Sequence, residues 1–480
     1  MSKNHLIAFG KLCSLVAIAT GGLMFASCAK DGFDDESFDS SVKNSQLATP
    51  TADNITVTAS ADGKTQTFSW PVVHGAGGYL VSLYNTEEMD DPIVRDTLVD
   101  GCSVTLPREE DLNYQFTIQT KGRSNLNNND AAEMVTYLFT TFSPSLATIP
   151  AGSDLYQWFA ENPVPDSEET IYYDLEAGGQ YTLSQTVDFS THAVVLRTAS
   201  KNDWATVTPA DGAALEYCGS FGLKYLIIDG SMTDNPLLAF SANPPASILD
   251  ASHNNHNQIT RPTSIQKCSF IHVQGMILYD NKVKYCLKDF VMDDCTIQLE
   301  PTDGMSNSSV FYVYDGGGFI NDFTMTNTTV WNANANTFKY LIRYNNSGRC
   351  DRAGYTTNSI NIKNCTMYNV VKTGQMCNHG GFDGQATSNY DVENNIFVDC
   401  GSHQVARRFV GRLNDAAKIV FNNNTYWFDG EANDQTGYDT GYILTTDPAF
   451  ANAAEGDFRP SGAEQLSMKT GDPRWLPSAE

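Results

Sequence analysis

The chain has 480 residues and a formal net charge of −26, from 56 acidic and 30 basic side chains. This charge excludes an electrostatic nucleic-acid binder, because such a protein needs a basic face. An acidic surface also repels polyanions, so an acidic polymer would need a bridging cation such as Ca²⁺. Tyrosine and glycine are frequent (22 and 36 residues) and long helical patterns are scarce, which favours an all-β class.

Residues 1–27 have the pattern of a bacterial export signal. Lys3 and Lys11 precede an apolar run, Leu12–Ala26, that is too short to cross a bilayer comfortably. The run ends in Phe25-Ala26-Ser27-Cys28, which resembles the bacterial lipobox. The resemblance implies that Cys28 is acylated and becomes the mature N-terminus. A plain secretory signal is the alternative.

Residues 28–48 are predicted to form an acidic, flexible tether, because Asp31, Asp34, Asp35 and Glu36 follow the lipobox at once. This acidic run resembles the surface-export signal of Bacteroidota lipoproteins. The resemblance implies a lipid-anchored protein of the outer membrane that faces the cell exterior. A linker without any export role is the alternative.

Residues 49–145 are predicted to form a small β-sandwich, since short runs such as Tyr79–Tyr84 alternate apolar and polar side chains. The order Trp70, Tyr79, Leu106, Tyr114 resembles a fibronectin type III domain. The resemblance implies that Trp70 fills the core and that Tyr114 forms a tyrosine corner. We expect this module to act as a spacer, with direct sugar binding as the alternative.

Residues 150–475 contain a repeated pattern of six positions. It consists of an apolar residue, two positions of any type, a small or amide residue, a fifth position that is mostly Ser or Thr, and a second apolar residue. Its instances start 27, 33, 37, 30 and 29 residues apart, at Ile265, Met292, Met325, Ile362, Val392 and Phe421. Each interval accommodates one coil of three short strands, which has too little apolar surface to fold alone. The pattern predicts a right-handed parallel β-helix. A propeller or a sandwich is the alternative, but a propeller needs longer, four-stranded repeats.

The fourth position of the repeat is predicted to form a stack of small residues at a tight bend. These residues are Cys268, Cys295, Thr328, Cys365, Asn395 and Asn424. The Asp or Asn just before the last five of them, at positions 294, 327, 364, 394 and 423, is typical of a left-handed turn residue. The cysteines are therefore predicted to be buried packing thiols rather than ligands.

The whole of residues 150–475 resembles the pectate-lyase-like β-helix superfamily. The tail carries motifs that resemble the closing segment of such proteins, at Asp447–Phe450, Gly456–Arg459 and Gly471–Trp475. With the module before it, the chain resembles lipoproteins of polysaccharide-utilisation systems. The resemblance implies an acidic, pectin-type polysaccharide as the partner, together with other glycan-uptake proteins.

A second strand can be aligned after each repeat, and it predicts the outer site. Tyr279, Tyr314 and Tyr344 are expected in one column that faces inward. Successive strand residues face opposite sides, so Asp280 and Asp315 are expected to face outward. The aligned His379, together with Arg343 and Lys339, completes that outer set.

The family resemblance implies β-elimination on a uronate for this outer set. Asp280 and Asp315 would hold the Ca²⁺ ion that neutralises the sugar carboxylate. Lys339 would take the C5 proton, and Arg343 would bind a carboxylate as a fork. The alternative is that these side chains are solvated surface residues or turn caps.

Further candidates for substrate binding are Arg349, Arg352, Arg407, Arg408 and His379, with packing or ion pairing as the alternative for each. The sequence has no GxSxG, HExxH or phosphate loop, and the catalytic motifs of the main pectate lyases and polygalacturonases are not evident. Two hypotheses therefore stand together. One is a surface lyase that cleaves pectin-type glycan, and the other is a surface protein that only binds it.

Overall fold

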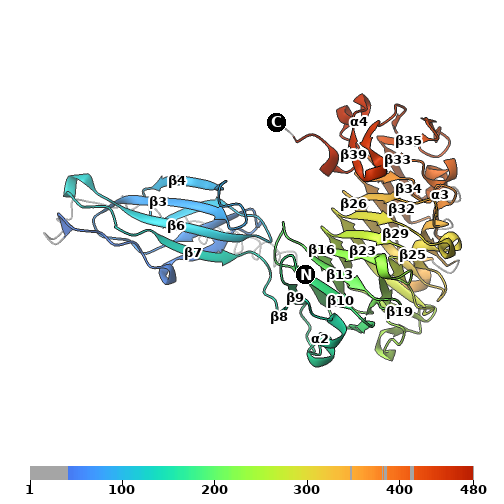
Figure 1. Cartoon of the computed structure of the whole chain (residues 1–480), viewed down its shortest axis with the longest axis horizontal. Coiled ribbons are helices and arrows are strands. Elements are labelled where there is room, and N and C mark those ends of the chain that lie inside the picture. Colours follow the sequence, from blue (N-terminus) through green and yellow to red (C-terminus); the bar gives the residue numbers. More distant parts are fainter. Residues whose placement is uncertain (1–41, 346–348, 381, 383–385, 411–415, 479–480) are drawn as a thin grey trace, which may run out of the picture. The chain divides into compact units, whose positions relative to one another are not determined.

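The computed structural model describes residues 42–345, 349–380, 382, 386–410 and 416–478. The chain divides into two compact units, residues 1–140 and 141–480 (Figure 1). The predicted signal peptide and the predicted lipidation site at Cys28 lie outside the described residues. Among the residues described, no helix is long and apolar enough to span a bilayer.

The first unit is a sandwich of two antiparallel sheets. One sheet has the order β1-β2-β5 and the other has the order β4-β3-β6-β7. The strands are β1 (Thr56–Ala59), β2 (Thr65–Ser69), β3 (Ala76–Asn85), β4 (Val94–Val99), β5 (Ser103–Pro107), β6 (Asn113–Gly122) and β7 (Val135–Thr140).

The core of the sandwich contains the aromatic residues that the sequence singled out. Trp70 is buried and packs edge-on against Tyr79, with ring centroids 5.3 Å apart. The Tyr114 hydroxyl accepts a hydrogen bond of 2.8 Å from the backbone N–H of Glu109, five residues upstream. This contact is the predicted tyrosine corner. Membership of the fibronectin type III family itself stays a prediction.

Residues 42–48, the last part of the predicted tether, lie against the sandwich. Leu47 is buried, and the backbone N–H of Asn44 donates to the carbonyl of Leu126. Gln46 forms a parallel bridge with Asn129. An ordered structure therefore begins before the predicted boundary at residue 49.

The second unit is a parallel β-helix whose coils contribute strands to three sheets, here called sheets I, II and III, and the last coils contribute to sheets I and II. Sheet I contains β8 (Ala147–Ile149), β9 (Ile171–Leu175), β12 (Val194–Thr198), β15 (Phe221–Lys224), β20 (Thr263–Gln266), β23 (Tyr285–Asp293), β26 (Phe319–Thr326), β29 (Asn358–Lys363), β32 (Ser388–Glu393) and β34 (Lys418–Asn422), with β18 (Leu249–Asp250) and β19 (His256–Ile259) beside β23. Sheet II contains β10 (Gln180–Leu183), β13 (Ala205–Pro209), β16 (Leu226–Asp229), β21 (Ser269–Val273), β24 (Thr296–Leu299), β27 (Thr329–Asn332), β30 (Thr366–Tyr368), β33 (Ile396–Val398), β35 (Asn424–Phe428), β36 (Glu431–Ala432) and β37 (Ile443–Leu444). Sheet III contains β11 (Val187–Asp188), β14 (Leu215–Tyr217), β17 (Leu238–Phe240), β22 (Leu278–Tyr279), β25 (Ser309–Val313), β28 (Tyr340–Tyr344) and β31 (Gln375–Asn378).

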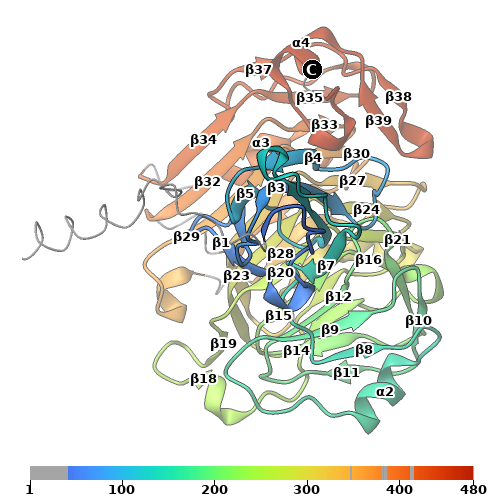
Figure 2. The same cartoon turned by 90° about the vertical axis from the view of Figure 1, so that its left-hand side faces the viewer.

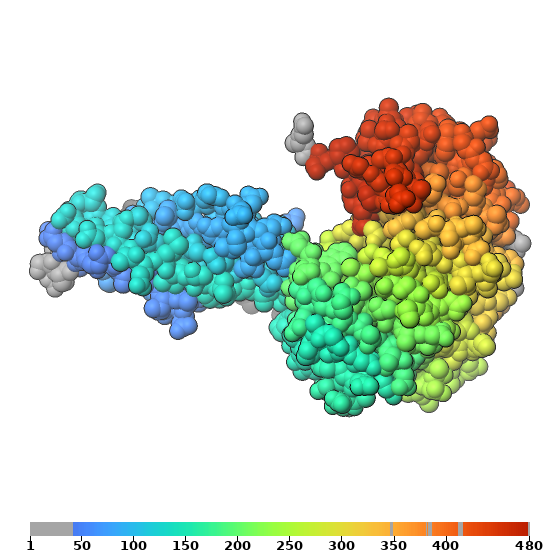
Figure 3. All heavy atoms as spheres, viewed as in Figure 1, coloured from blue at the N-terminus to red at the C-terminus, as the bar shows by residue number. Residues whose placement is uncertain are grey.

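The coils stack in chain order, as the steady change of colour along this unit shows in Figures 1 and 3. Helix α2 (Leu155–Glu161) lies beside β10 and β11 at the start of the stack, and α4 (Ala463–Met468) lies at the other end (Figure 2). A short helix, α3 (Val405–Val410), packs on β31. The predicted all-β class, a parallel β-helix preceded in the chain by a small sandwich, is confirmed.

The bend between sheets I and II takes the predicted left-handed conformation. The φ angles are 54° at Asp294, 49° at Asn327, 53° at Asn364, 58° at Asn394 and 53° at Asn423. Asp and Asn adopt this conformation at lower cost than other non-glycine residues, because their short polar side chains bond locally. The recurrence of these two residues is therefore explained by the backbone.

The residue after each bend is fully buried, as predicted for Cys268, Cys295, Thr328, Cys365, Asn395 and Asn424. Burial raises the pKa of the Cys268 thiol to about 12, so it packs as an un-ionised side chain. The two asparagines add hydrogen bonds between coils. The Asn395 side chain accepts from the N–H of Cys365 (2.9 Å) and donates to the carbonyl of Ile362 (2.8 Å).

The C-terminal segment folds back over the outer face of sheet II. It includes β38 (Phe450–Asn452) and β39 (Asp457–Pro460), and the Phe458 ring packs against Trp331 at 5.6 Å. Farther along, the Thr329 hydroxyl donates to Asp472 (2.7 Å) and accepts from the indole of Trp475 (2.7 Å). This segment therefore occupies a face that a ligand could otherwise reach.

Asn395→Ala should lower the free energy of unfolding of the β-helix by about 2 kcal/mol, because it leaves the Cys365 N–H and the Ile362 carbonyl buried without this partner. Urea unfolding of the full chain measures the loss. Asn389, half-buried on β32, is the matched control, and its replacement by Ala should change the value by less than about 0.5 kcal/mol. Equal losses of unfolding free energy in the two variants would contradict the proposed role of Asn395 in the stack of small residues at the bend.

Candidate functional site

The outer face of sheet III carries a column of side chains that matches between coils. The strand register places Tyr279 beside Tyr312, Tyr312 beside Arg343, and Arg343 beside Asn378. The residues just before them, Leu278, Phe311, Ile342 and Cys377, are buried and form the inward column. Because strand residues alternate between faces, the column of Tyr279, Tyr312, Arg343 and Asn378 faces outward, with about 4.8 Å between coils.

The predicted alignment of this sheet was wrong in register. Tyr279 pairs with Tyr312 rather than with Tyr314, and Tyr344 pairs with Val313. Tyr344 is buried as expected, but Tyr279 and Tyr314 are half-buried. The inward apolar residues fix the register, whereas the prediction matched tyrosines across turns of unequal length.

Tyr279 and Tyr312 form a fixed aromatic pair. Their rings stack with centroids 5.9 Å apart and an interplanar angle of 17°. Each hydroxyl donates to a different oxygen of Asp315, at 2.9 Å from Tyr279 and 3.0 Å from Tyr312. Burial, together with the Asp315 carboxylate, raises the pKa of both tyrosines, so both hydroxyls stay protonated and remain donors.

Arg343 lies next to this pair and is held by aromatic rings. Its guanidinium carbon is 4.1 Å from the centroid of Tyr314 and 4.7 Å from that of Tyr340. The side chain is half-buried, and within the described parts of the chain its guanidinium forms no ion pair and no hydrogen bond. Five N–H donors are thus positioned by stacking while still available to a ligand.

Lys339, the predicted base, reaches the same cluster. Its ammonium nitrogen is 5.7 Å from the Tyr340 centroid and 3.5 Å from the side-chain oxygen of Asn307. The lysine is exposed, and Tyr340 is buried. The structure therefore brings Lys339 and Arg343 to one tyrosine ring, as two cations on the same outer face.

Asp280 does not face outward, and its prediction as a calcium ligand beside Asp315 does not fit the geometry. It is fully buried, and its oxygens accept from the backbone N–H of Gly316 (2.8 Å) and of Lys282 (3.0 Å). Asp280 thus joins the turns of two coils beneath the site. No group of three or more His, Cys, Asp or Glu side chains that could hold a metal occurs among the described residues.

The predicted binding arginines of the loop after β28 lie apart from this cluster. Arg349 pairs with Asp351, with 2.9 Å between nitrogen and oxygen, and both side chains are largely exposed. Arg352 is exposed in the same short helical turn. Neither forms a described contact with Arg343, so the structure does not bring these predicted residues together.

The remaining candidates lie on or beside α3. Arg407 is exposed, 5.9 Å from the ring of Tyr438, and Arg408 is half-buried. His379 was expected on the outer face, but it is buried. Its Nε2 atom bonds to the carbonyl of Phe409 at 2.9 Å. His379 therefore packs α3 against the coil, which the sequence could not show because α3 follows a loop.

The outer face of sheet I differs, because it carries lysines that form ion pairs with neighbouring carboxylates. Lys288 forms an ion pair with Asp322. Lys363 lies 2.6 Å from Asp391 and 3.0 Å from Glu393. The C-terminal segment covers β27 and β30 of sheet II. Sheet III presents an arginine that aromatic rings surround and that has no acidic partner in the described structure.

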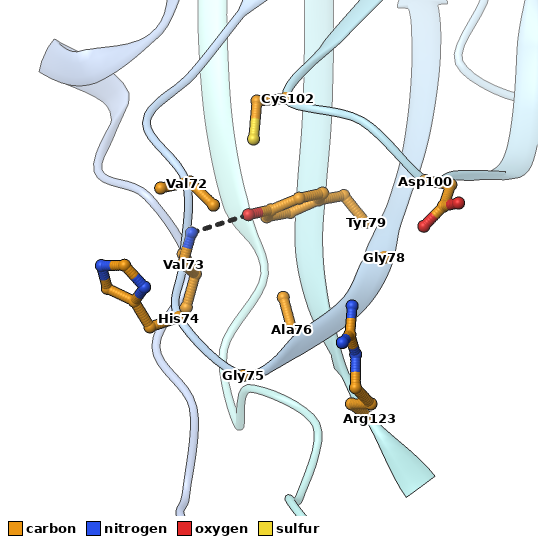
Figure 4. A pocket seen from close by; sticks show the side chains of 10 residues that line it. All are labelled: Val72, Val73, His74, Gly75, Ala76, Gly78, Tyr79, Asp100, Cys102 and Arg123. Atoms are coloured by element: carbon orange, nitrogen blue, oxygen red, sulfur yellow. Dashed lines mark hydrogen bonds between the residues drawn. The ribbon is translucent and has the colours of Figure 1, made fainter. Parts of the chain in front are cut away.

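The sandwich has a pocket of its own, beside the turn between β2 and β3 (Figure 4). Tyr79 crosses it, and the tyrosine hydroxyl accepts from the N–H of Val73 at 2.8 Å. Its lining includes Val72, His74, Asp100, Cys102 and Arg123. The hydroxyl in this pocket thus already has a structural role as a hydrogen-bond acceptor.

Sequence reasoning found Arg343, Lys339 and Asp315 but missed Tyr312 and Tyr340. The alternation Tyr312-Val313-Tyr314 contained a signal, since both tyrosines of such a run face the same side. Tyr340 gave no signal, because its role depends on contacts of its ring with two cations, Lys339 and Arg343.

Three family models match the chain, and each is described as a domain of unknown function: DUF4992 over residues 1–178, DUF4957 over 179–333 and DUF5123 over 360–475. No curated protein matches. Among solved structures, an alginate lyase of the PL6 family, AlyGC, is 11% identical with a TM-score of 0.32, over 68% of this chain and 45% of that one. The pectate lyase PelI from Erwinia chrysanthemi, in complex with tetragalacturonic acid, is 11% identical with a TM-score of 0.14, over 66% of this chain and 87% of that one. The chain thus spans less than half the length of the alginate lyase.

The stability contribution of Asp280 should depend on pH. Burial, aided by the charge of Asp315, raises the pKa of Asp280 to about 6 from an ordinary 3.8. The folded state therefore holds this proton more tightly than the unfolded state, and ionisation between about pH 4 and pH 7 lowers stability. The unfolding free energy of the wild type minus that of Asp280→Asn should fall by about 2 kcal/mol over this range.

Urea unfolding at several pH values measures this difference. Asp351→Asn, at an exposed carboxylate, is the control and should show no comparable trend. A wild-type advantage over Asp280→Asn that grows as the pH rises would contradict the burial argument.

Proposed function

We propose that this protein binds an acidic polysaccharide of the pectin type on the outer face of sheet III. The observation that supports this most strongly is Arg343, stacked on Tyr314 and Tyr340 and without an acidic partner among the described residues. A guanidinium fork matches a carboxylate in two hydrogen bonds, and stacking fixes the fork in advance. A sugar carboxylate would therefore supply the partner that the protein does not.

The aromatic pair beside Arg343 suits the body of a sugar. Tyr279 and Tyr312 offer apolar ring surface and are held at fixed positions by Asp315. Aromatic side chains give large contact areas with little loss of conformational freedom. Because the column repeats from coil to coil, a polymer along the β-helix axis would meet a new side chain at every coil.

The N-terminal patterns support a surface location for this binding. In this proposal the lipid on Cys28 anchors the protein in the outer membrane, facing the exterior, and the sandwich acts as a fibronectin-like spacer. The bound polymer would be passed to other glycan-uptake proteins. These elements rest on the sequence resemblance.

Arg343→Ala should weaken binding to pectin by about tenfold or more, since it removes the carboxylate partner. Gel retardation and isothermal titration with the purified ectodomain measure the affinity. Arg459→Ala is the matched control, because Arg459 is an exposed arginine outside the column and outside the predicted binding residues. Equal affinity in wild type and Arg343→Ala would contradict the proposed site.

A second candidate is cleavage by β-elimination, favoured by the shared contact of Lys339 and Arg343 with Tyr340. Arg343 would bind the uronate carboxylate, which acidifies the proton on C5. Lys339 in its neutral form would take that proton as the bond from C4 to the glycosidic oxygen breaks. A C4–C5 double bond forms, and the leaving oxygen takes a proton from water.

Cleavage would appear as ultraviolet absorbance of the unsaturated product. Lys339→Ala should then reduce the rate by about a hundredfold or more, as expected for loss of a general base. Lys282→Ala, at an exposed lysine of a neighbouring turn, is the control and should retain the rate. No product from the wild type, or an unchanged rate in Lys339→Ala, would exclude this candidate.

A further inference from the structure

Two opposite charges flank Tyr312 on the outer face of sheet III without neutralising each other. Asp315 accepts hydrogen bonds from Tyr279 and Tyr312, and Arg343 is next to Tyr312 in the column. Within the described structure neither charged group has an ion-pair partner. A bound polymer would therefore meet a positive position and a negative position on neighbouring coils.

We infer that this face selects a glycan in which an acidic sugar has a neutral neighbour, and that it disfavours a polymer with a carboxylate on every sugar. The inference rests on the proposed function, because it concerns the same site. One sugar carboxylate would be bound by Arg343. The neighbouring sugar, on the ring pair of Tyr279 and Tyr312, would face Asp315.

Two hydrogen bonds hold the Asp315 carboxylate where it would face the neighbouring sugar. Both of its oxygens accept hydrogen bonds, at 2.9 and 3.0 Å, from two different tyrosines. An ionised carboxylate only accepts hydrogen bonds, so two donors match it and fix its position. A second carboxylate placed there would be repelled by a like charge that two hydrogen bonds hold in place, whereas a neutral sugar could offer hydroxyl donors.

The strand spacing makes successive sugars fall on different coils. Neighbouring strands of sheet III are about 4.8 Å apart, which is roughly the length of one sugar unit in an extended chain. A ligand with its carboxylate at Arg343 thus places the next unit near Tyr312 and Tyr279. A polymer with a carboxylate on alternate sugars places a carboxylate at Arg343 and a neutral sugar at Asp315. A polymer with a carboxylate on every sugar places a second carboxylate at Asp315.

The test compares two polymers at equal carboxylate concentration, with a chelator present so that no free divalent cation bridges the charges. One is polygalacturonate, and the other is a backbone in which galacturonate strictly alternates with neutral rhamnose. Isothermal titration with the full ectodomain should give at least about tenfold tighter binding of the alternating polymer. Asp315→Asn should reduce this ratio by about fivefold or more, and the control Asp351→Asn should leave the ratio unchanged.

Each outcome is informative. Binding of neither polymer by the wild type overturns the proposed function. Equal binding of both polymers, or a preference for polygalacturonate, overturns this inference and leaves the proposed function intact. If Asp315→Asn fails to fold, the ratio of the wild type's affinities for the two polymers is measured from about 0.02 M to about 0.5 M salt instead. Screening of the charges should bring this ratio toward one as the salt concentration rises. An affinity ratio that does not change with the salt concentration would also overturn the inference.

Discussion

The bend between sheets I and II is the constraint on which the rest of the β-helix depends. A left-handed residue turns the chain, and the next side chain enters the core and stacks on its counterpart in the neighbouring coil. Asn395 and Asn424 reinforce this stack with hydrogen bonds between coils. Because the bend fixes where sheet I ends and sheet II begins in each coil, it gives the strands on its two sides the same coil-to-coil register.

The bend could be predicted from sequence, because its requirements are local and repeat in every coil. Sheet III could not be predicted to the same degree. The segments between the bend and sheet III differ in length from coil to coil. The register of sheet III therefore follows from inward contacts such as Phe311 beside Leu278. A shift of one residue moves a side chain to the opposite face. For this reason Asp280, expected outside, is buried, and Tyr279, expected inside, faces outward.

The acidic composition predicted that a cation must accompany any acidic ligand. The structure holds a positive charge at Arg343 between aromatic side chains, whereas Asp280 is buried and accepts hydrogen bonds from backbone N–H groups. Asp315 instead orients the two tyrosines beside the arginine. An aromatic surround lets a guanidinium stay half-buried without an acidic partner, since the rings supply cation–π attraction. A local positive site can thus persist on a protein whose net charge is −26.

A crystal structure of the protein with a bound acidic oligosaccharide would test the central claim most directly. The account predicts a sugar chain along the column of sheet III, with one carboxylate in a two-bond contact with Arg343 and a sugar ring over Tyr279 or Tyr312. An oligosaccharide bound elsewhere, on the sandwich or on sheet I, with Arg343 left without a ligand, would contradict it.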